Sequence, residues 1–392
     1  MNDTLYMAWQ YLTHHKVKTV ILVLSIALII FLPIGLKVIV DQSSDSLTAR
    51  AESTPLVIGA KGSPLELVLN TLYFESKTPE VMRYAEADRV SGYGATAIPV
   101  YARFRVDEQP IIGTTLDYFE FRGLEIIKGR NMVLLGECVL GAIAAERLGA
   151  KPGESVISSP DSVFDIAGTY PLKMRVVGVL EQTDSPDDEA VFVDVKTAWI
   201  IAGLAHGHQD LSKPEASSQV LKKEGSVFVG NAAVVQYNEI TPDNIDSFHF
   251  HGDVSAFPIT AVIAVPPDAK ASALLQGKYL GAEERVQIIR PLDTIDELLE
   301  TVISVRSYVV MAVIVVGFST LLTTILVFML SLRLRQREIL TMHRIGGCRR
   351  RIFGILAAEI MVTAFIGVCL AGVLTALTAK YGSAVIQSIV MG

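Results

Sequence analysis

An arginine-rich stretch between two long apolar runs constrains this 392-residue chain more than any other feature. Residues 333–351 hold seven arginines against one carboxylate. Short cytoplasmic loops are enriched in Lys and Arg, whereas long domains cross a membrane largely regardless of their charge. We therefore expect this loop to lie inside, and the large region between the first two apolar runs to lie outside.

Three apolar stretches are long enough to cross a bilayer. Residues 19–40, 308–332 and 352–379 comprise 22, 25 and 28 residues, and only Lys37 and Glu359 among them are charged. Each exceeds the roughly 20 residues that a transmembrane helix needs. The first could instead be a cleaved signal peptide, but its apolar core is longer than the usual ~7–15 residues and no clear small-residue cleavage site follows. The expected fold class is a membrane α-helical protein with three transmembrane helices and a large extracytoplasmic α+β domain.

The segment boundaries follow from these spans. Residues 1–18 are predicted as an amphipathic helix on the cytoplasmic side, or equally as a helical extension of the first span. The external domain covers 41–301, with an insertion at 203–255. Residues 302–332 form the end of a stalk and the second span, 333–351 a cytoplasmic loop, 352–379 the third span and 380–392 a short C-terminal segment.

Charge and cysteine usage exclude some classes of function. Residues 41–301 carry 22 basic and 38 acidic side chains, a balance of −16, so nucleic acid is not expected as a partner. The remaining basic charge lies near the expected inner membrane face, where it can meet anionic lipid headgroups. The three cysteines fall in the domain, the loop and the third span, so no disulfide is expected.

Local patterns predict an α+β domain. Helices are expected at 142–148, where Gly149 and Pro152 follow, at 272–279, and from 293 without interruption into the second span. Residues 203–238 have little apolar periodicity and are interpreted as an insertion or a long loop. Strands are predicted at 91–105, 164–180, 190–195 and 259–265.

No pattern for catalysis is present. The chain has no GxxxxGK[ST] loop, nucleophile elbow, HExxH helix or cysteine-rich metal pattern, so we do not expect an enzyme. The nearest approach to a phosphate loop, 59–63 (GAKGS), is interpreted as a glycine turn. The acidic run Asp184, Asp187, Asp188 and Glu189 lacks the alternating spacing of a calcium loop and is interpreted as a solvated turn between strands.

Four of the seven histidines form two HxH pairs, His206 with His208 and His249 with His251. Positions two apart on a strand face the same side, so each pair can present two imidazoles to a cation such as zinc. If the pairs meet, they make a four-nitrogen site. The alternative is that the two HxH pairs occur by coincidence on exposed loops and bind no metal.

Two features of the membrane part need partners. Glu359 lies about two turns into the third span, where a carboxylate either pairs with a functional group or reaches water at the inner interface. Ile339, Met342 and Ile345 recur on one helical face of the arginine-rich loop. An apolar stripe of this kind docks onto a protein or packs on the membrane surface.

Four stretches together resemble the MacB/FtsX-like permeases, the membrane subunits of mechanotransmitting ABC transporters. The stretch AWQYLTHHKVKTVILVLSIAL resembles the N-terminal helix and first span of that family. Other parts of the sequence resemble the periplasmic core domain of that family, namely GTTLDYFEFRGLEIIKGR with GECVLGAIAAERLGAKPGES, and MRVVGVLEQTDSPDDEAVFVD. The stretch RLRQREILTMHRIGGCRRRIFGILAAE resembles the loop that couples the spans to the ATPase.

The resemblance implies a machine of two copies of this chain with two separate ATPase subunits. Glu338, Met342, Ile345 and Gly346 would then meet the ATPase, and Glu359 matches an acidic position at the start of the third span. ATP would be bound by the partner, and this chain would need no cofactor beyond a possible zinc ion. The family normally has four spans, whereas only thirteen residues follow Ala379, so the C-terminus is expected outside.

Two main functions remain open, both at the bacterial inner membrane with a cytoplasmic N-terminus and a periplasmic domain. The first is a permease that exports a substrate or extracts it from the outer leaflet, with a possible periplasmic adaptor or substrate-binding protein. The second is an ATP-driven signalling scaffold that regulates a periplasmic cell-wall hydrolase. A zinc-linked transporter or a metal-binding receptor is a further alternative.

Overall fold

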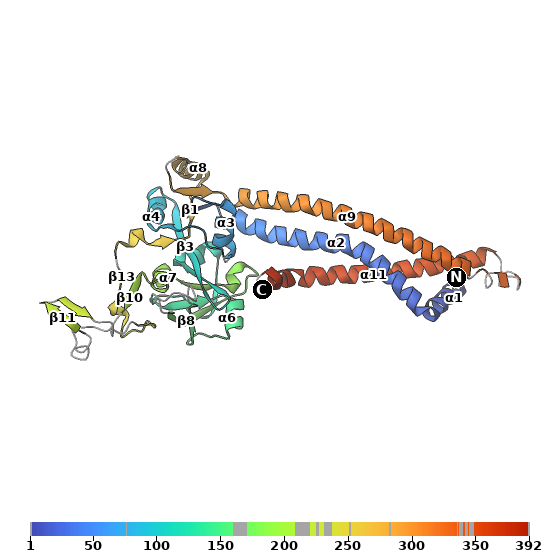
Figure 1. Cartoon of the computed structure of the whole chain (residues 1–392), viewed down its shortest axis with the longest axis horizontal. Coiled ribbons are helices and arrows are strands. Elements are labelled where there is room, and N and C mark those ends of the chain that lie inside the picture. The colour runs from blue at the N-terminus through green and yellow to red at the C-terminus, as the bar shows by residue number, and fades with distance from the viewer. Residues whose placement is uncertain are drawn as a thin grey trace. The chain divides into compact units, whose positions relative to one another are not determined.

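The computed structural model of the chain divides into two compact units (Figure 1). Unit 1 contains Met1–Ala49 and Glu297–Gly392, and unit 2 is Arg50–Asp296. The structure describes residues 2–75, 77–159, 171–207, 220–224, 227–230, 237–250, 252–281, 284–334, 336, 340–341, 344 and 349–390.

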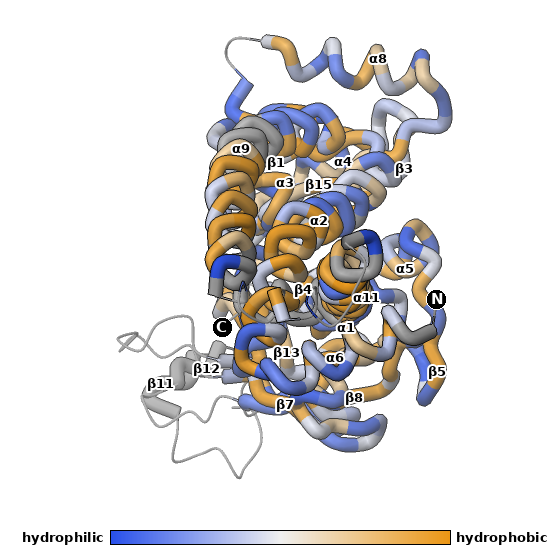
Figure 2. The backbone as a smooth tube through the Cα atoms, turned by 90° about the vertical axis from the view of Figure 1, so that its right-hand side faces the viewer, coloured by the Kyte–Doolittle hydropathy of each residue, from blue (hydrophilic) through white to orange (hydrophobic). Residues whose placement is uncertain are grey.

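Long helices make up the described part of unit 1. A short helix α1 (Asn2–His14) precedes α2 (Lys16–Glu52), and the second half of the unit contains α9 (Pro291–Leu334) and α11 (Arg349–Val390). Helices α2 and α9 begin or end in unit 2, since their last or first residues belong to it. Hydrophobic residues dominate along all three long helices (Figure 2).

Two of these helices contain a segment that is long and apolar enough to cross a membrane, Lys16–Ile39 in α2 and Phe353–Lys380 in α11. In α9 the apolar segment found among the described residues, Val310–Thr323, is shorter than a span. The two long apolar helices that flank the α+β domain are therefore established, whereas the third predicted span is not. The prediction that the stalk continues into residues 308–332 as one helix is confirmed by α9.

Helices α2 and α11 approach each other at a glycine. A Cβ atom added to Gly367 would lie 2.7 Å from Cγ2 of Ile26, and the amide Nε2 of Gln42 donates to the carbonyl of Ala379 at 3.0 Å. Small residues that allow two backbones to approach are typical of helix packing within membranes, where hydrophobicity alone does not hold helices together.

Unit 2 is an α+β domain built on a mixed sheet, ten-stranded over the described residues, in the order β16-β1-β15-β3-β4-β9-β6-β8-β5, with β7 paired to β8. Neighbouring strands are antiparallel except for the pairs β4–β9 and β6–β8. The strands are β1 (Leu56–Ala60), β3 (Thr96–Val106), β4 (Gln109–Thr114), β5 (Ile126–Gly129), β6 (Glu137–Leu140), β7 (Ser155–Ile157), β8 (Lys173–Leu180), β9 (Val191–Asp194), β15 (Ala261–Val265) and β16 (Val286–Ile289).

Short helices connect these strands and begin and end at recognisable signals. The side chain of Ser63 accepts a hydrogen bond from the backbone of Glu66 at the start of α3, and Gly149 ends α6 with a φ of 61°. Both are standard helix caps. The helices are α3 (Pro64–Tyr73), α4 (Ala85–Gly92), α5 (Leu116–Arg122), α6 (Ala142–Leu148), α7 (Val195–Ile201) and α8 (Ala269–Lys278).

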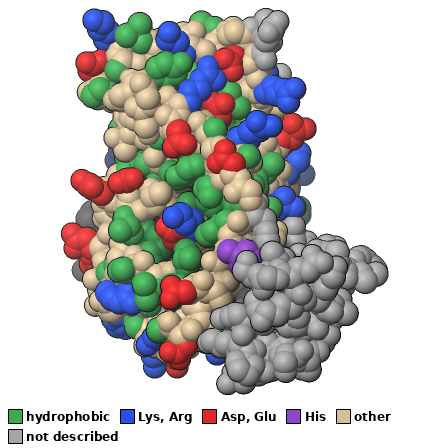
Figure 3. All heavy atoms as spheres, turned by 90° about the vertical axis from the view of Figure 1, so that its left-hand side faces the viewer, with side chains coloured by type: hydrophobic (Ala, Val, Ile, Leu, Met, Phe, Trp, Pro, Cys, Tyr) green, Lys and Arg blue, Asp and Glu red, His purple; other side chains and the backbone are tan. Residues whose placement is uncertain are grey.

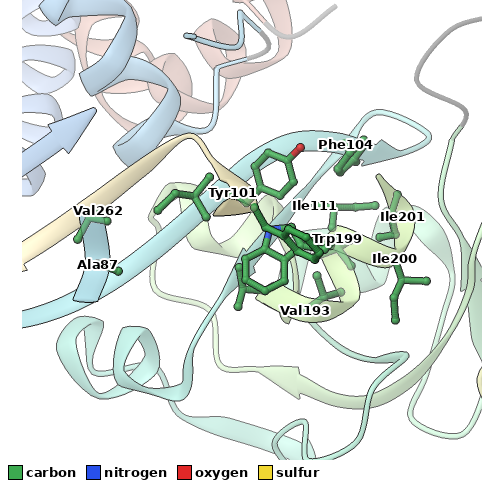
Figure 4. Close-up of a cluster of buried hydrophobic side chains, with 14 of the residues drawn as sticks. Ala87, Tyr101, Phe104, Ile111, Val193, Trp199, Ile200, Ile201 and Val262 are labelled. Atoms are coloured by element: carbon green, nitrogen blue, oxygen red, sulfur yellow. The ribbon is translucent and has the colours of Figure 1, made fainter. Parts of the chain in front are cut away.

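The core of the domain centres on Trp199 of α7 (Figure 4). Its ring is fully buried, lies 5.2 Å from the rings of both Tyr84 and Phe257, and donates its Nε1–H to the carbonyl of Pro258. A buried indole needs such an acceptor, because an unpaired polar group in the core is costly.

Among the described residues, three two-stranded ribbons accompany the sheet. They pair β10 (Ala205–Gly207) with β13 (Phe248–Phe250), β11 (Val220–Glu224) with β12 (Val227–Gly230), and β14 (Pro258–Ile259) with β2 (Met82–Arg83). Part of the region 203–238 therefore has strand structure, although most of it lies outside the described residues.

The predictions for the domain hold in part. Helix α6 and strands β9 and β15 confirm the predictions at 142–148, 190–195 and 259–265, and α8 begins slightly before the predicted helix. The predicted strand at 91–105 is wrong at its beginning, because residues up to Gly92 belong to α4. Buried Ala87 and Val90 hold this short helix against the domain despite its weak local signal. Of the strand at 164–180, the described part begins at Lys173.

Candidate functional site

The last turn of α2 enters the α+β domain and ends in a buried ion pair. Arg50 donates from Nη1 to Oδ2 of Asp187 at 2.7 Å and from Nη2 to Oδ1 at 2.9 Å. Arg50 is 9% exposed and Asp187 is 2% exposed. A bidentate pair of this kind is both strong and geometrically specific, because the planar guanidinium matches the two carboxylate oxygens.

Two further side chains complete the site around this pair. We call the four residues Arg50, Asp187, Tyr118 and Arg122 the α2 anchor. The hydroxyl of Tyr118 donates to Oδ1 of Asp187 at 2.7 Å and accepts from Nη2 of Arg50 at 3.0 Å. Arg50 also donates from Nε to the carbonyl of Leu72. Every oxygen of the buried carboxylate therefore has a donor, as a buried charge requires.

Helix α5 also forms hydrogen bonds to the residues that follow the end of α2. Its residue Arg122 donates to Oγ of Ser53 at 3.0 Å and to Oγ1 of Thr54 at 2.8 Å. The hydroxyl of Thr54 in turn donates to the carbonyl of Arg50, and so ends the helix. Two arginines, one from each helix, thus fix the point at which α2 meets the sheet domain.

Asp187 lies on a short 3₁₀ helix, η1 (Pro186–Glu189), whose shape presents its carboxylate to Arg50. Ser185 and Asp188 form a capping box at its start, and Asp188 also accepts from the backbone of Thr183. The backbone of η1 passes so close to Gly141 that a Cβ there would lie 2.3 Å from the carbonyl oxygen of Asp187. Only glycine fits at this position.

The sequence interpretation of the acidic run as a solvated turn is wrong for three of its four members. Asp187, Asp188 and Glu189 are all buried. Asp187 pairs with Arg50, Asp188 caps the 3₁₀ helix, and Glu189 meets Arg147 at 3.2 Å. Local composition indicated solvation because the positive partner of Asp187 lies 137 residues earlier in the chain.

The electrostatics of the α2 anchor favour the charged pair. Burial by itself would raise the pKa of Asp187, but the charge and hydrogen bonds of Arg50 outweigh it and bring the pKa below its ordinary value. Burial, together with the charge of Asp187, raises the pKa of the Tyr118 hydroxyl, which stays a donor. Burial also lowers the pKa of Arg122.

Within unit 1, the structure places Glu359 beside Lys18. Oε1 of Glu359 lies 3.6 Å from Nζ of Lys18, and the carboxylate side chain is only 2% exposed. Lys18 also lies over the ring of Tyr11, 5.4 Å from its centroid. The carboxylate of Glu359 is thus buried beside a cation of the same unit.

The other residues singled out in the sequence are placed only in part. His206 and His249 face each other on the β10–β13 ribbon, whereas His208 and His251 lie outside the described residues. Glu338, Met342, Ile345 and Gly346 also lie outside them. In the part of the chain that the structure describes, no three His, Cys, Asp or Glu side chains gather closely enough to form a metal site.

Comparison with known families agrees with this architecture. The family described as "MacB-like periplasmic core domain" matches residues 19–241, which is more than half of the chain. This chain belongs to the MacB-like periplasmic core domain family. It is accordingly a membrane-anchored protein whose α+β unit is of the MacB periplasmic type, flanked by two long apolar helices.

Two solved structures are similar to parts of this chain. The periplasmic region of MacB from Actinobacillus actinomycetemcomitans is 14% identical, with a TM-score of 0.33, and the match covers 64% of this chain and 95% of that one. The extracellular domain of the noncanonic ABC-type transporter YknZ from Gram-positive bacteria is also 14% identical, with a TM-score of 0.31, over 60% of this chain and 98% of that one. No curated protein matches the sequence.

Proposed function

We propose that this MacB-like chain is the permease subunit of an ABC transporter, in which a separate ATPase moves the α+β domain by way of α2 and α9. The observation that carries the proposal is the α2 anchor at the end of a helix that begins as a membrane span. Helix α2 is continuous from Lys16 to Glu52, and its apolar segment ends at Ile39. The eleven residues from there to Arg50 extend about 16 Å at the rise of an α-helix.

A rigid helix transmits displacement only if both of its ends are fixed. The α2 anchor fixes one end, since rotation or withdrawal of α2 would pull Arg50 away from Asp187 and leave two buried charges unpaired. That outcome costs several kcal/mol, so the domain is expected to follow the helix. Helix α9 provides a second continuous connection, from Pro291 in the domain to Leu334.

The orientation and the remaining partners belong to the same proposal. The seven arginines of 333–351 support a cytoplasmic position for that loop and a periplasmic position for the α+β domain at a bacterial inner membrane. In this topology residues 308–332 cross the membrane as the second span. Glu338, Met342, Ile345 and Gly346 then contact the ATPase, and two copies of the chain share two ATPase subunits. A periplasmic adaptor or substrate-binding protein would supply the cargo.

The proposal is tested by isolating the full chain with its partners. The tagged protein is purified from its native host in mild detergent and examined by native mass spectrometry. We expect a complex of two copies of the chain with two ATPase subunits. Recovery of the chain alone, even after crosslinking in the membrane, would contradict a permease role.

A pair of variants makes the experiment specific. Ile345→Asp puts a charge on the apolar stripe of the arginine-rich loop and should release the ATPase. Val133→Asp is the matched control, because Val133 is 77% exposed on the α+β domain and its change should leave the complex intact. Equal loss of the ATPase in both variants would point to general destabilisation, and retention in both would exclude the proposed contact.

A further inference from the structure

Two histidines lie directly opposite each other on the β10–β13 ribbon. The antiparallel register pairs His206 with His249, flanked by Ala205 with Phe250 and Gly207 with Phe248. Side chains of directly opposed residues leave the same face of a ribbon, with Cβ atoms roughly 5 Å apart. Figure 3 shows that histidine side chains reach the surface on one side of the molecule. Both histidines are partly buried, so they are accessible to a small ion.

The separation of the two rings matches that of imidazoles that share a metal ion. Their centroids lie 5.1 Å apart, with an angle of 64° between the ring planes. Zinc binds imidazole nitrogen at about 2.0–2.1 Å in tetrahedral geometry, and two rings held in that way have centroids roughly 5 Å apart. The ribbon therefore already holds the two imidazoles at the spacing that a shared metal ion requires.

A second observation concerns the hydrogen bond of His249. Its Nδ1 lies 3.0 Å from the carbonyl oxygen of Ser247. A carbonyl only accepts, so Nδ1 carries the proton and the lone pair of the neutral ring is on Nε2. Metal-binding histidines commonly donate their other ring nitrogen to a carbonyl in this way, which fixes the tautomer and orients the ring.

We propose that His206 and His249 together bind one divalent transition-metal ion of the zinc type, between β10 and β13. The two imidazoles fill two of the four positions that zinc prefers and leave the others to water or to a further ligand. The site is independent of the permease role, since it rests on the ribbon alone. It would exist in the same form in a receptor or a scaffold.

The location of the pair indicates what a bound ion would change. β10 starts four residues after the end of α7, and β13 ends at Phe250, whose ring lies 6.4 Å from Trp199 and 6.0 Å from Phe257 in the core. A metal ion shared by the two strands would crosslink β10 and β13 beside this core.

The test measures zinc binding by the full chain, purified without a histidine tag in detergent and stripped with a chelator. Equilibrium dialysis against zinc chloride, followed by elemental analysis, should give one bound zinc ion per chain. His206→Ala and His249→Ala should each weaken binding at least tenfold, since loss of even an outer-shell partner costs about that much. The matched control is the double variant His14→Ala/His15→Ala, which removes two neighbouring histidines from α1 and its end and should bind zinc as the parent does.

Folding and binding are distinguished by the fluorescence of Trp199, recorded for every variant in a Trp9→Phe background because the chain has two tryptophans. A variant with an unchanged Trp199 spectrum and weakened zinc binding supports the site. Failure of the parent chain to hold zinc, or undiminished binding in the double variant His206→Ala/His249→Ala, would overturn the proposal and leave the two rings as a packing contact.

Discussion

Replacement of Arg50 by methionine should destabilise the α+β domain strongly, and the size of the effect can be worked out from the α2 anchor. Methionine keeps most of the length of the side chain but leaves the carboxylate of Asp187 buried without its counter-ion. Breaking a buried ion pair from one side typically costs about 3–5 kcal/mol. The carboxyl can limit this cost by taking up a proton.

Protonation of Asp187 sets an upper bound on the stability that the variant loses through its unpaired carboxylate, and this bound depends on pH. The ordinary pKa of Asp187 is 3.8, so holding it neutral at pH 7 costs about 4.4 kcal/mol at 1.36 kcal/mol per unit. At pH 5 the same step costs only about 1.6 kcal/mol. In the variant the folded pKa lies above the unfolded one, so its deficit in stability should shrink as the pH falls from 7 towards 4. In the parent chain the lowered pKa has the opposite effect, and stability is lost only below the ordinary pKa.

The assay is denaturant unfolding of the full chain in detergent, followed by tryptophan fluorescence. The chain has two tryptophans, and Trp9→Phe leaves the fully buried Trp199 as the reporter of the domain. We expect Arg50→Met to lose about 3–4 kcal/mol at pH 7, within the bound set by protonation, and clearly less at pH 5. In a double-mutant cycle, Asp187→Asn should be strongly non-additive with it.

The control for this prediction is an exposed ion pair in the same domain. Lys77 pairs with Glu66, but their side chains are 70% and 37% exposed. Lys77→Met should therefore cost no more than about 1 kcal/mol. A loss of less than 1 kcal/mol in Arg50→Met, or a deficit that does not change between pH 7 and pH 5, would refute the reasoning about the buried pair.

Three further variants test other parts of the structure. Despite its burial, Glu137 has a pKa lowered to about 2 by hydrogen bonds from Arg130 and two backbone amides. The stability that this ionised carboxylate contributes should therefore be lost as the pH falls from 4.5 to 2. Glu137→Gln should flatten that part of a plot of unfolding free energy against pH. Gly141→Ala places a Cβ against the backbone of η1 and should lower the free energy of unfolding, measured by Trp199 fluorescence, by about 1–3 kcal/mol. Glu359→Gln removes the charge that pairs with Lys18 and should lower the thermal midpoint of the membrane part, measured by far-ultraviolet circular dichroism, whereas an unchanged midpoint would indicate that the pair adds nothing.

Sequence patterns predict those elements whose signals are local. Helix α6 was predictable because Gly149 and Pro152 follow it directly, and α9 because its apolar run continues the stalk. The α2 anchor was not predictable in the same way. The burial of Arg50 cannot be recognised in the local sequence, because its partner Asp187 lies 137 residues later and is brought to it only by folding.

The same limit explains what the sequence predicted for the acidic run and for the histidines. Residues such as Asp187 and Asp188 are typical of an exposed turn, and only the arrival of α2 makes burial favourable. For the histidines the alternation of HxH suggested a shared face, and the register that sets His206 against His249 comes from the pairing of β10 with β13. A local pattern can indicate the type of side chain that a site needs, whereas the pairing of distant segments decides whether a site forms.

The most direct test of the account is a distance measurement between the two α+β domains of the assembled complex. Glu120 is exposed on α5, and Glu120→Cys in a background with Cys348→Ser and Cys369→Ser gives one accessible spin-label site per chain, because Cys138 is buried. With the ATPase bound, ATP should shift the distance distribution between the two labels, and the shift should be reduced in Arg50→Met. A distribution that is the same with and without ATP, or a shift that Arg50→Met leaves unchanged, would contradict transmission through the α2 anchor.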